Sequence, residues 1–172
     1  NTIIIDDFYA KLLTGNLGEI QSFIETHHPP LTVSHSSNKS ALHTILDLDD
    51  NKVNREMRYL ICEFLIEKGV SVNGYNSNGQ TPLHIAVANG YENIVDLLLA
   101  NNANTGALDN NRQNVLHYAV RNYNSLCPTS GIRPINRPSN IPIRTINEVS
   151  SKIAVFLKDT MNINTNTPDE FN

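Results

Sequence analysis

Cysteine is scarce in this sequence, since Cys62 and Cys127 are the only two thiols in 172 residues. So few cysteines exclude a disulfide-rich secreted scaffold and a zinc site made of cysteines. Charged residues are also few, at 17%, and the net charge of −4 argues against a general nucleic-acid binder. No run of about 20 apolar residues occurs, so we expect no helix that inserts into a membrane.

A targeting signal is also missing from the start of the chain. The apolar residues 3–5 are followed by Asp6 and Asp7, and no basic residue precedes them, so we expect no secretory signal peptide. A chain with few cysteines and no such signal suits the reducing cytosol. The sequence does not begin with Met, from which we expect a piece excised from a longer protein.

One short motif recurs along the chain. The motif TPLHIA at residues 81–86 is followed 33 residues later by NVLHYA at 114–119, and SALHTI at 40–45 lies 41 residues before it. Each copy begins with Ser, Thr or Asn, whose side-chain oxygen caps the first turn of a helix. Pro82 suits the first helical position, where its missing N–H costs nothing. Each copy therefore predicts the start of a short helix.

A second apolar helix is predicted after each copy. The expected stretches are 60–68, 91–101 and 151–159. Near the N-terminus, the apolar residues that follow Gly15 have the same offsets as those that follow Gly90, so residues 6–28 predict a degenerate helix pair. Gly- and Asn-rich segments at 73–79 and 106–111 predict hairpin-like turns between units. Such a unit cannot bury its own apolar face, so the units are expected to stack.

With these features the sequence resembles the ankyrin-repeat family, most closely over residues 76–108. The resemblance implies an all-α solenoid of about 3.5–4 stacked helix-turn-helix units with hairpin-like turns, forming a single domain over residues 1–172. The expected units are 6–33, 34–75, 76–108 and 109–165. Asn38 and Arg112 stand where the middle unit has Gly79. Because arginine seldom adopts a positive φ, the turn at Arg112 is expected to differ.

Two insertions separate the paired helices. The interval is 11 residues from His84 to Val95, 19 from His43 to Cys62 and 36 from His117 to Ile153, which leaves 8 and 25 extra residues. The longer insertion, residues 123–147, is rich in proline and arginine. Three readings of it stay open: a solvated segment, a partner contact through Arg133, Arg137 and Arg144, or packing against the shorter, acidic insertion.

Reactive chemistry is not indicated. The motif residues His43, His84 and His117 would lie about 10 Å apart on stacked units, too far for one zinc ion. We expect each imidazole to bond its turn and hold the start of its helix. The acidic residues Asp47, Asp49 and Asp50 lack the glycine and glutamate of a calcium loop and predict a solvated acidic loop. Cys62 is expected in the core, and Cys127 has no base beside it. We therefore expect no catalytic residue, cofactor or metal, and no enzyme.

The resemblance implies a protein–protein interaction module that binds through its turn tips and the exposed side of its first helices. The contact positions that it implies are Ser36, Ser37, Lys39, Asp47, Ser77, Asn78, Gln80, Ala88, Asn89, Asn110, Asn111, Gln113 and Arg121, with Tyr118 and Tyr123 as aromatic anchors. The partner is expected to be another protein, and the chain alone a monomer. Two alternatives remain: a targeting domain excised from a larger enzyme or host-directed effector, and a structural or autoinhibitory module that uses residues 123–147.

Overall fold

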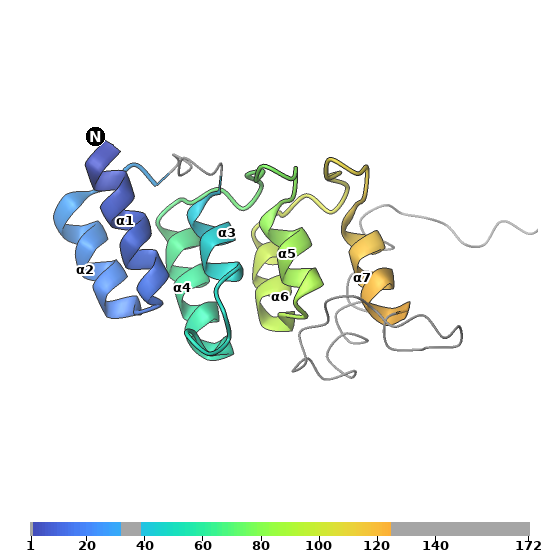
Figure 1. Cartoon of the computed structure of the whole chain (residues 1–172), viewed down its shortest axis with the longest axis horizontal. Coiled ribbons are helices and arrows are strands. Elements are labelled where there is room, and N and C mark those ends of the chain that lie inside the picture. The colour runs from blue at the N-terminus through green and yellow to red at the C-terminus, as the bar shows by residue number, and fades with distance from the viewer. Residues whose placement is uncertain (1, 32–38, 125–172) are drawn as a thin grey trace, which may run out of the picture.

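The computed structural model describes residues 2–31 and 39–124, and this part of the chain contains seven helices and no strand (Figure 1). The helices are α1 (Thr2–Thr14), α2 (Leu17–His27), α3 (Ala41–Leu46), α4 (Arg55–Glu67), α5 (Pro82–Ala88), α6 (Glu92–Ala100) and α7 (Val115–Asn124). The expected all-α solenoid is confirmed for this part. The expected helix at 151–159 lies outside the described residues.

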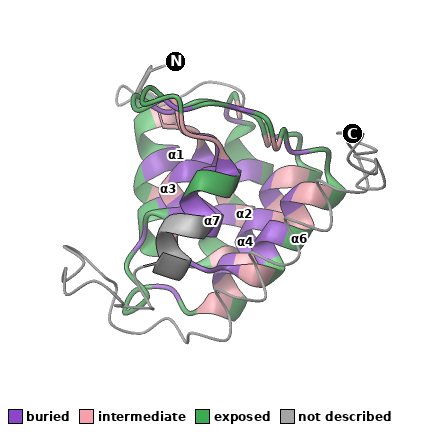
Figure 2. Cartoon of the chain, turned by 90° about the vertical axis from the view of Figure 1, so that its right-hand side faces the viewer, coloured by how far each residue is buried: buried purple, intermediate pink, exposed green. Residues whose placement is uncertain are grey.

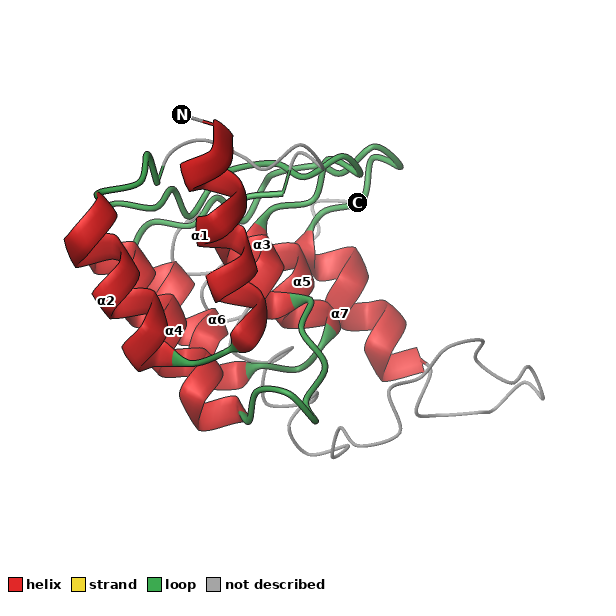
Figure 3. Cartoon of the chain, turned by 60° about the vertical axis from the view of Figure 1, so that its left-hand side comes forward, coloured by secondary structure: helices red, strands yellow, loops and turns green. Residues whose placement is uncertain are grey.

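The helices stand in two parallel rows. Each of the first three pairs folds back on itself, and the pairs follow one another in single file (Figure 1). Helices α1, α3, α5 and α7 contact their neighbours in one row, and α2, α4 and α6 do so in the other. The turns between pairs collect along one edge of the stack, and the loops within the pairs lie along the opposite edge (Figure 3).

The core lies where the helices face one another (Figure 2). The motif leucines Leu42 and Leu83 are completely buried, and so is Cys62. Leu116 holds the same motif position in α7 but is 39% exposed. Among the described helices, α7 packs against α5.

The motif fixes where the first helices begin. Ser40 caps α3 and Thr81 caps α5, each in a capping box with the histidine three residues later. Pro82 is the first residue of α5, as its fixed φ favours. At each helix start the histidine ring accepts the N–H of the capping residue, which gives these six- and seven-residue helices a defined beginning.

The structure of the shorter insertion corrects two expectations: where the following helix begins, and that the acidic loop is solvated. Helix α4 begins at Arg55, not near residue 60, because Asn54 caps it and accepts the Met57 N–H at 2.7 Å. The preceding loop is not simply solvated. The completely buried guanidinium of Arg58 donates to Asp50 at 2.7 Å and also to the carbonyl oxygen of Leu48. The loop is therefore built around a buried arginine that the sequence did not reveal.

The turn at Arg112 also corrects an expectation. Arg112 has φ 59° and Gly79 has φ 71°, so both residues adopt the left-handed conformation. The two turns close with the same bonds: Gly79 N–H to the Asn76 carbonyl, and Arg112 N–H to the Asp109 carbonyl, both at 2.9 Å. The surrounding hydrogen bonds therefore impose the backbone conformation on a residue that disfavours it.

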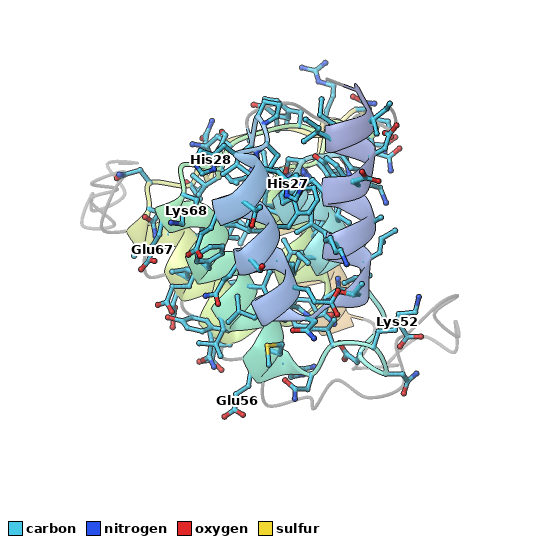
Figure 4. The ribbon with its side chains drawn as sticks, turned by 90° about the vertical axis from the view of Figure 1, so that its left-hand side faces the viewer. His27, His28, Lys52, Glu56, Glu67 and Lys68 are labelled. Atoms are coloured by element: carbon cyan, nitrogen blue, oxygen red, sulfur yellow. The ribbon has the colours of Figure 1, made fainter. Side chains whose placement is uncertain are left out.

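The N-terminal pair α1–α2 has a polar outer face. Lys11 and Glu19 form an ion pair at 3.1 Å there. Counted from Gly15 and Gly90, their equivalents in the middle unit are Ala86 and Ile94, which are buried. His27 stacks on the ring of Phe23 with 4.3 Å between centroids, and His28 ends α2 with φ 47°. Both histidines are labelled in Figure 4.

Candidate protein-binding surface

Within the described residues, no group of three or more His, Cys, Asp or Glu side chains could hold a metal ion. The one cysteine there, Cys62, is buried, and burial raises the pKa of its thiol to about 12. A thiol in that state is not a nucleophile at neutral pH. None of the described helices is long and apolar enough to cross a bilayer.

The motif histidines join each unit to the next. The Nε2 of His43 donates to the carbonyl oxygen of Gln80 at 2.8 Å, and that of His84 donates to the carbonyl oxygen of Gln113 at 3.2 Å. On the other side of each ring, Nδ1 accepts the backbone N–H of its own helix cap, at 3.3 Å and 3.1 Å. The structural role expected for these histidines is present, and it reaches across two units.

Tyr9 makes the equivalent bond in the first pair. Its hydroxyl donates to the carbonyl oxygen of Lys39 at 2.9 Å. Tyr9 lies six residues before Gly15 as His84 lies six before Gly90, and Lys39 precedes its motif as Gln80 does. One hydrogen bond of the same topology therefore crosses each of the three interfaces between first helices.

Neighbouring turns are also bonded to one another. Asn76 and Asp109 hold equivalent places, and the Oδ1 of each accepts two backbone N–H groups of its own turn at 2.8–2.9 Å. The backbone N–H of Asn110 donates to the carbonyl oxygen of Asn78 at 3.0 Å, and its side-chain Nδ2 donates to that of Ser77 at 2.9 Å. The turn tips thus form a fixed array beside the first helices. We call the exposed side of that row of helices, together with these tips, the inner face.

The contact positions expected from the resemblance divide into two groups. Ser77, Asn78 and Asn111 are exposed, and their side chains make no hydrogen bond within the described residues. Others form hydrogen bonds between repeat units. The amide of Gln80 donates to the Tyr118 hydroxyl at 2.8 Å, and that of Asn89 donates to the Leu46 carbonyl at 3.4 Å. Ala88 and Gln113 are half-buried, and Asp47 pairs with Lys39 at 2.6 Å.

Of the two expected aromatic anchors, Tyr118 is buried and the side chain of Tyr123 is not described. Tyr118 lies edge-on to the ring of His84 and donates its hydroxyl to Asp109 at 2.8 Å. It therefore supports the turn from beneath and does not stand out from the surface. Arg121 and Tyr123 lie on α7, whose side chains from residue 120 onward are not described. Ser36, Ser37, Arg133, Arg137 and Arg144 lie outside the described residues.

Three exposed apolar side chains belong to this surface and were not expected. Tyr75 and Leu108 are 52% and 49% exposed, and they hold the same position in consecutive turns, 33 residues apart. Leu13 is 52% exposed and lies two residues before Gly15, as Ala88 lies two before Gly90. The repeat spacing was the signal that could have found all three.

A groove of about 430 Å³ opens on the inner face between α1 and α3. Apolar parts of its wall come from Tyr9, Ala10, Leu13 and Leu48. Its polar wall comprises Asp6, Lys39, Thr44 and Asp47. A hollow of this size with a few charged groups at its edge can receive side chains of another molecule.

A family model described as "Ankyrin repeats (3 copies)" matches the chain over residues 10–109 and 51–128. The chain therefore belongs to the ankyrin-repeat family. Members of this family generally serve as protein-interaction modules.

Two of three similar proteins are named for the same repeat. The chain is 26% identical over 98 residues to ankyrin repeat protein L484 of Acanthamoeba polyphaga mimivirus. This match covers 54% of the chain and 5% of the viral protein. It is 31% identical over 91 residues to ankyrin repeat protein FPV244 of fowlpox virus, covering 45% and 14%. It is also 38% identical over 61 residues to human transient receptor potential cation channel subfamily A member 1, covering 36% and 6%. The matched segments are thus short parts of much longer proteins.

Proposed function

We propose that this chain binds another protein through the inner face, without catalysing a reaction. The observation that carries the proposal is the division of polar side chains along the turns. Some hold the turns in place, whereas Ser77, Asn78 and Asn111 are exposed with unused donors and acceptors. Polar groups on a preformed backbone bind with little ordering cost. The exposed Tyr75 and Leu108 add apolar area to the same turns.

A matched pair of double variants tests this. Ser77→Ala with Asn78→Ala removes two free polar groups from the inner face. Ser22→Ala with Asn93→Ala makes the same chemical change on the exposed surface of α2 and α6. Affinity capture from eukaryotic lysate identifies the protein retained by the unaltered chain, and titration with that purified protein gives the dissociation constants.

The expected result is a dissociation constant raised about tenfold by the first double variant and unchanged by the second, with both melting as the unaltered chain does. Equal affinities for all three proteins would refute binding through the turn tips. Turnover of a substrate by the purified chain would contradict the non-catalytic part.

A second candidate is that this chain is the recognition part of a larger protein. What supports it is the length of the relatives, of which the chain spans between 5% and 14%. Two of them are viral, which supports a partner inside a host cell as one form of this candidate. Sequencing the complete reading frame tests it: a further domain is expected, and a frame confined to these repeats would exclude it.

A further inference from the structure

The groove between α1 and α3 differs chemically from the rest of the inner face. In the middle unit, the exposed or half-buried contact positions Ser77, Asn78, Gln80, Ala88 and Asn89 carry no charge. The groove, in contrast, has carboxylates from both helices that form it: Asp6 from α1, and Asp47 at the end of α3. Asp7 is exposed beside Asp6. Among the contact positions whose side chains are described, ionised groups therefore occur at this end of the stack.

Apolar surface lies between these carboxylates. Leu13 and Ala10 are exposed on the α1 wall, and Leu48 lies in the opposite wall. The hydroxyl of Tyr9 already donates to the Lys39 backbone carbonyl. The aromatic ring therefore lines the groove without a hydroxyl that needs a hydrogen-bond acceptor from the partner. The groove thus combines aliphatic contact area with negative charge at its rim.

Lys39 is the cation among the described residues that line the groove, and it is not buried. Its Nζ lies 2.6 Å from Asp47 Oδ2, and both side chains are more than a third exposed. An exposed pair of this kind contributes little to stability and can exchange partners. A cation arriving from another molecule can therefore take the place of Lys39 beside Asp47 while Lys39 moves into solvent.

The net charge of the surrounding chain also favours a cationic segment of a partner. Residues 1–111 contain 6 Lys and Arg against 13 Asp and Glu, a balance of −7. A field of this sign draws cationic segments toward the surface and raises their rate of association. The apolar and acidic walls then select among them, because a bare cation would leave Leu13 uncovered.

We propose that the groove between α1 and α3 binds a segment of the partner protein in which an arginine or lysine stands next to aliphatic residues. The aliphatic side chain packs on Ala10 and Leu13, and the cation lies between Asp6 and Asp47 after displacing Lys39. This proposal rests on the proposed function and adds to it the chemistry of the partner. It also makes Lys39 an internal competitor, whose removal tightens binding.

The test uses a displayed library of random 12-residue peptides, selected on the complete chain. Recovered peptides are synthesised, and their affinities are measured for the unaltered chain, for Asp6→Asn with Asp47→Asn, and for Lys39→Ala. The control is Glu56→Gln with Glu67→Gln, which removes the same charge from the two ends of α4, away from the groove (Figure 4). It separates a local contact from the general field of the protein.

We expect recovered peptides to carry Arg or Lys beside Leu, Ile or Val. The Asp6/Asp47 variant should weaken their binding about fivefold or more, and Lys39→Ala should tighten it about threefold, whereas the Glu56/Glu67 control changes it less than twofold. Replacing the basic residue of the peptide by glutamine should weaken binding to the unaltered chain but not to the Asp6/Asp47 variant.

The other outcomes are distinguishable. Peptides that are neutral or acidic, and that lose affinity with Ser77→Ala and Asn78→Ala, would overturn the groove proposal and leave binding through the turn tips intact. Basic peptides that lose equal affinity in the Glu56/Glu67 control would show attraction by net charge alone, which also overturns it. Failure to recover any peptide above background would count against both proposals.

Discussion

The imidazole of His43 and the carbonyl of Gln80 belong to different units, yet a 2.8 Å hydrogen bond joins them. The same ring accepts the backbone N–H of Ser40 through its other nitrogen. A neutral imidazole can make both bonds, because one nitrogen donates while the other accepts. His43, which holds the cap at the start of α3, therefore also fixes the position of the turn before α5.

This arrangement predicts loss of stability in acid. Burial lowers the pKa of both His43 and His84 below the usual 6.5, against the opposing effect of the carbonyl bonds. The unfolded chain thus binds protons more readily than the folded one, so the contribution is complete above pH 6.5 and is lost as the pH falls below it. Urea unfolding between pH 5 and 7.5 measures the effect, with His43→Gln as the comparison. This variant should be less stable at pH 7.5 and should lose less on acidification; an equal loss would contradict the assignment.

Tyr9→Phe tests the equivalent bond in the first pair. The substitution removes only the hydroxyl that donates to Lys39. Loss of this bond should reduce the free energy of unfolding by about 1 kcal/mol. Tyr75→Phe is the matched control, because its hydroxyl belongs to an exposed ring and no change is expected. Urea denaturation of the two variants gives the comparison, and equal stabilities would mean that the Tyr9 bond contributes nothing.

The buried arginine of α4 predicts a large effect. Arg58 is fully buried and donates to the carbonyl oxygens of Ile45, Leu48 and Val53 as well as to Asp50. Arg58→Met keeps most of the volume but removes the buried donor from all four acceptors, of which Asp50 keeps the Tyr91 hydroxyl at 3.0 Å and Ile45 keeps the Leu48 N–H at 3.4 Å. A loss of about 3–5 kcal/mol is expected. Asp50→Asn should cost less, since the Asp50 side chain is 39% exposed. Calorimetric melts rank the two variants, and a smaller loss for Arg58→Met would contradict this role.

The two equivalent turns predict losses of stability of different size. Gly79 has φ 71°, and a Cβ there would lie 2.5 Å from Asn110 Oδ1, so Gly79→Ala should destabilise by about 2 kcal/mol or more. Arg112→Gly relieves the strain of the left-handed conformation at φ 59°. It also raises the conformational entropy of the unfolded chain, so the net change in the free energy of unfolding should stay within about 1 kcal/mol. Thermal unfolding of both variants checks the difference, which equal losses would refute.

The repeat spacing predicted much of this fold and part of its surface. The helix starts, the stacking of units and the burial of Leu42, Leu83 and Cys62 all followed from caps and apolar offsets. Arg58 could not be predicted, because an arginine on an amphipathic helix ordinarily faces water, and three of its four partners lie in an insertion without a repeat equivalent. The conformation of Arg112 was mispredicted, since local preference was outweighed by the bonds of the turn.

Contact positions were harder to predict than the fold, for a physical reason. Gln80 and Tyr118 are polar residues at repeat positions that face the surface, yet they bond to each other across two units. Sequence alone does not show whether a polar side chain is used inside the stack or left for a partner. The exposed Leu13, Tyr75 and Leu108 were missed because apolar residues were assigned to the core by default.

Hydrogen–deuterium exchange of the chain, with and without the captured protein, tests the central proposal most directly. Binding through the inner face predicts slower exchange in the turns around Asn78 and Asn111 and in the first helices α1, α3 and α5. The second helices α2, α4 and α6 should exchange at unaltered rates. Protection confined to the second helices, with the turns unaffected, would contradict the account.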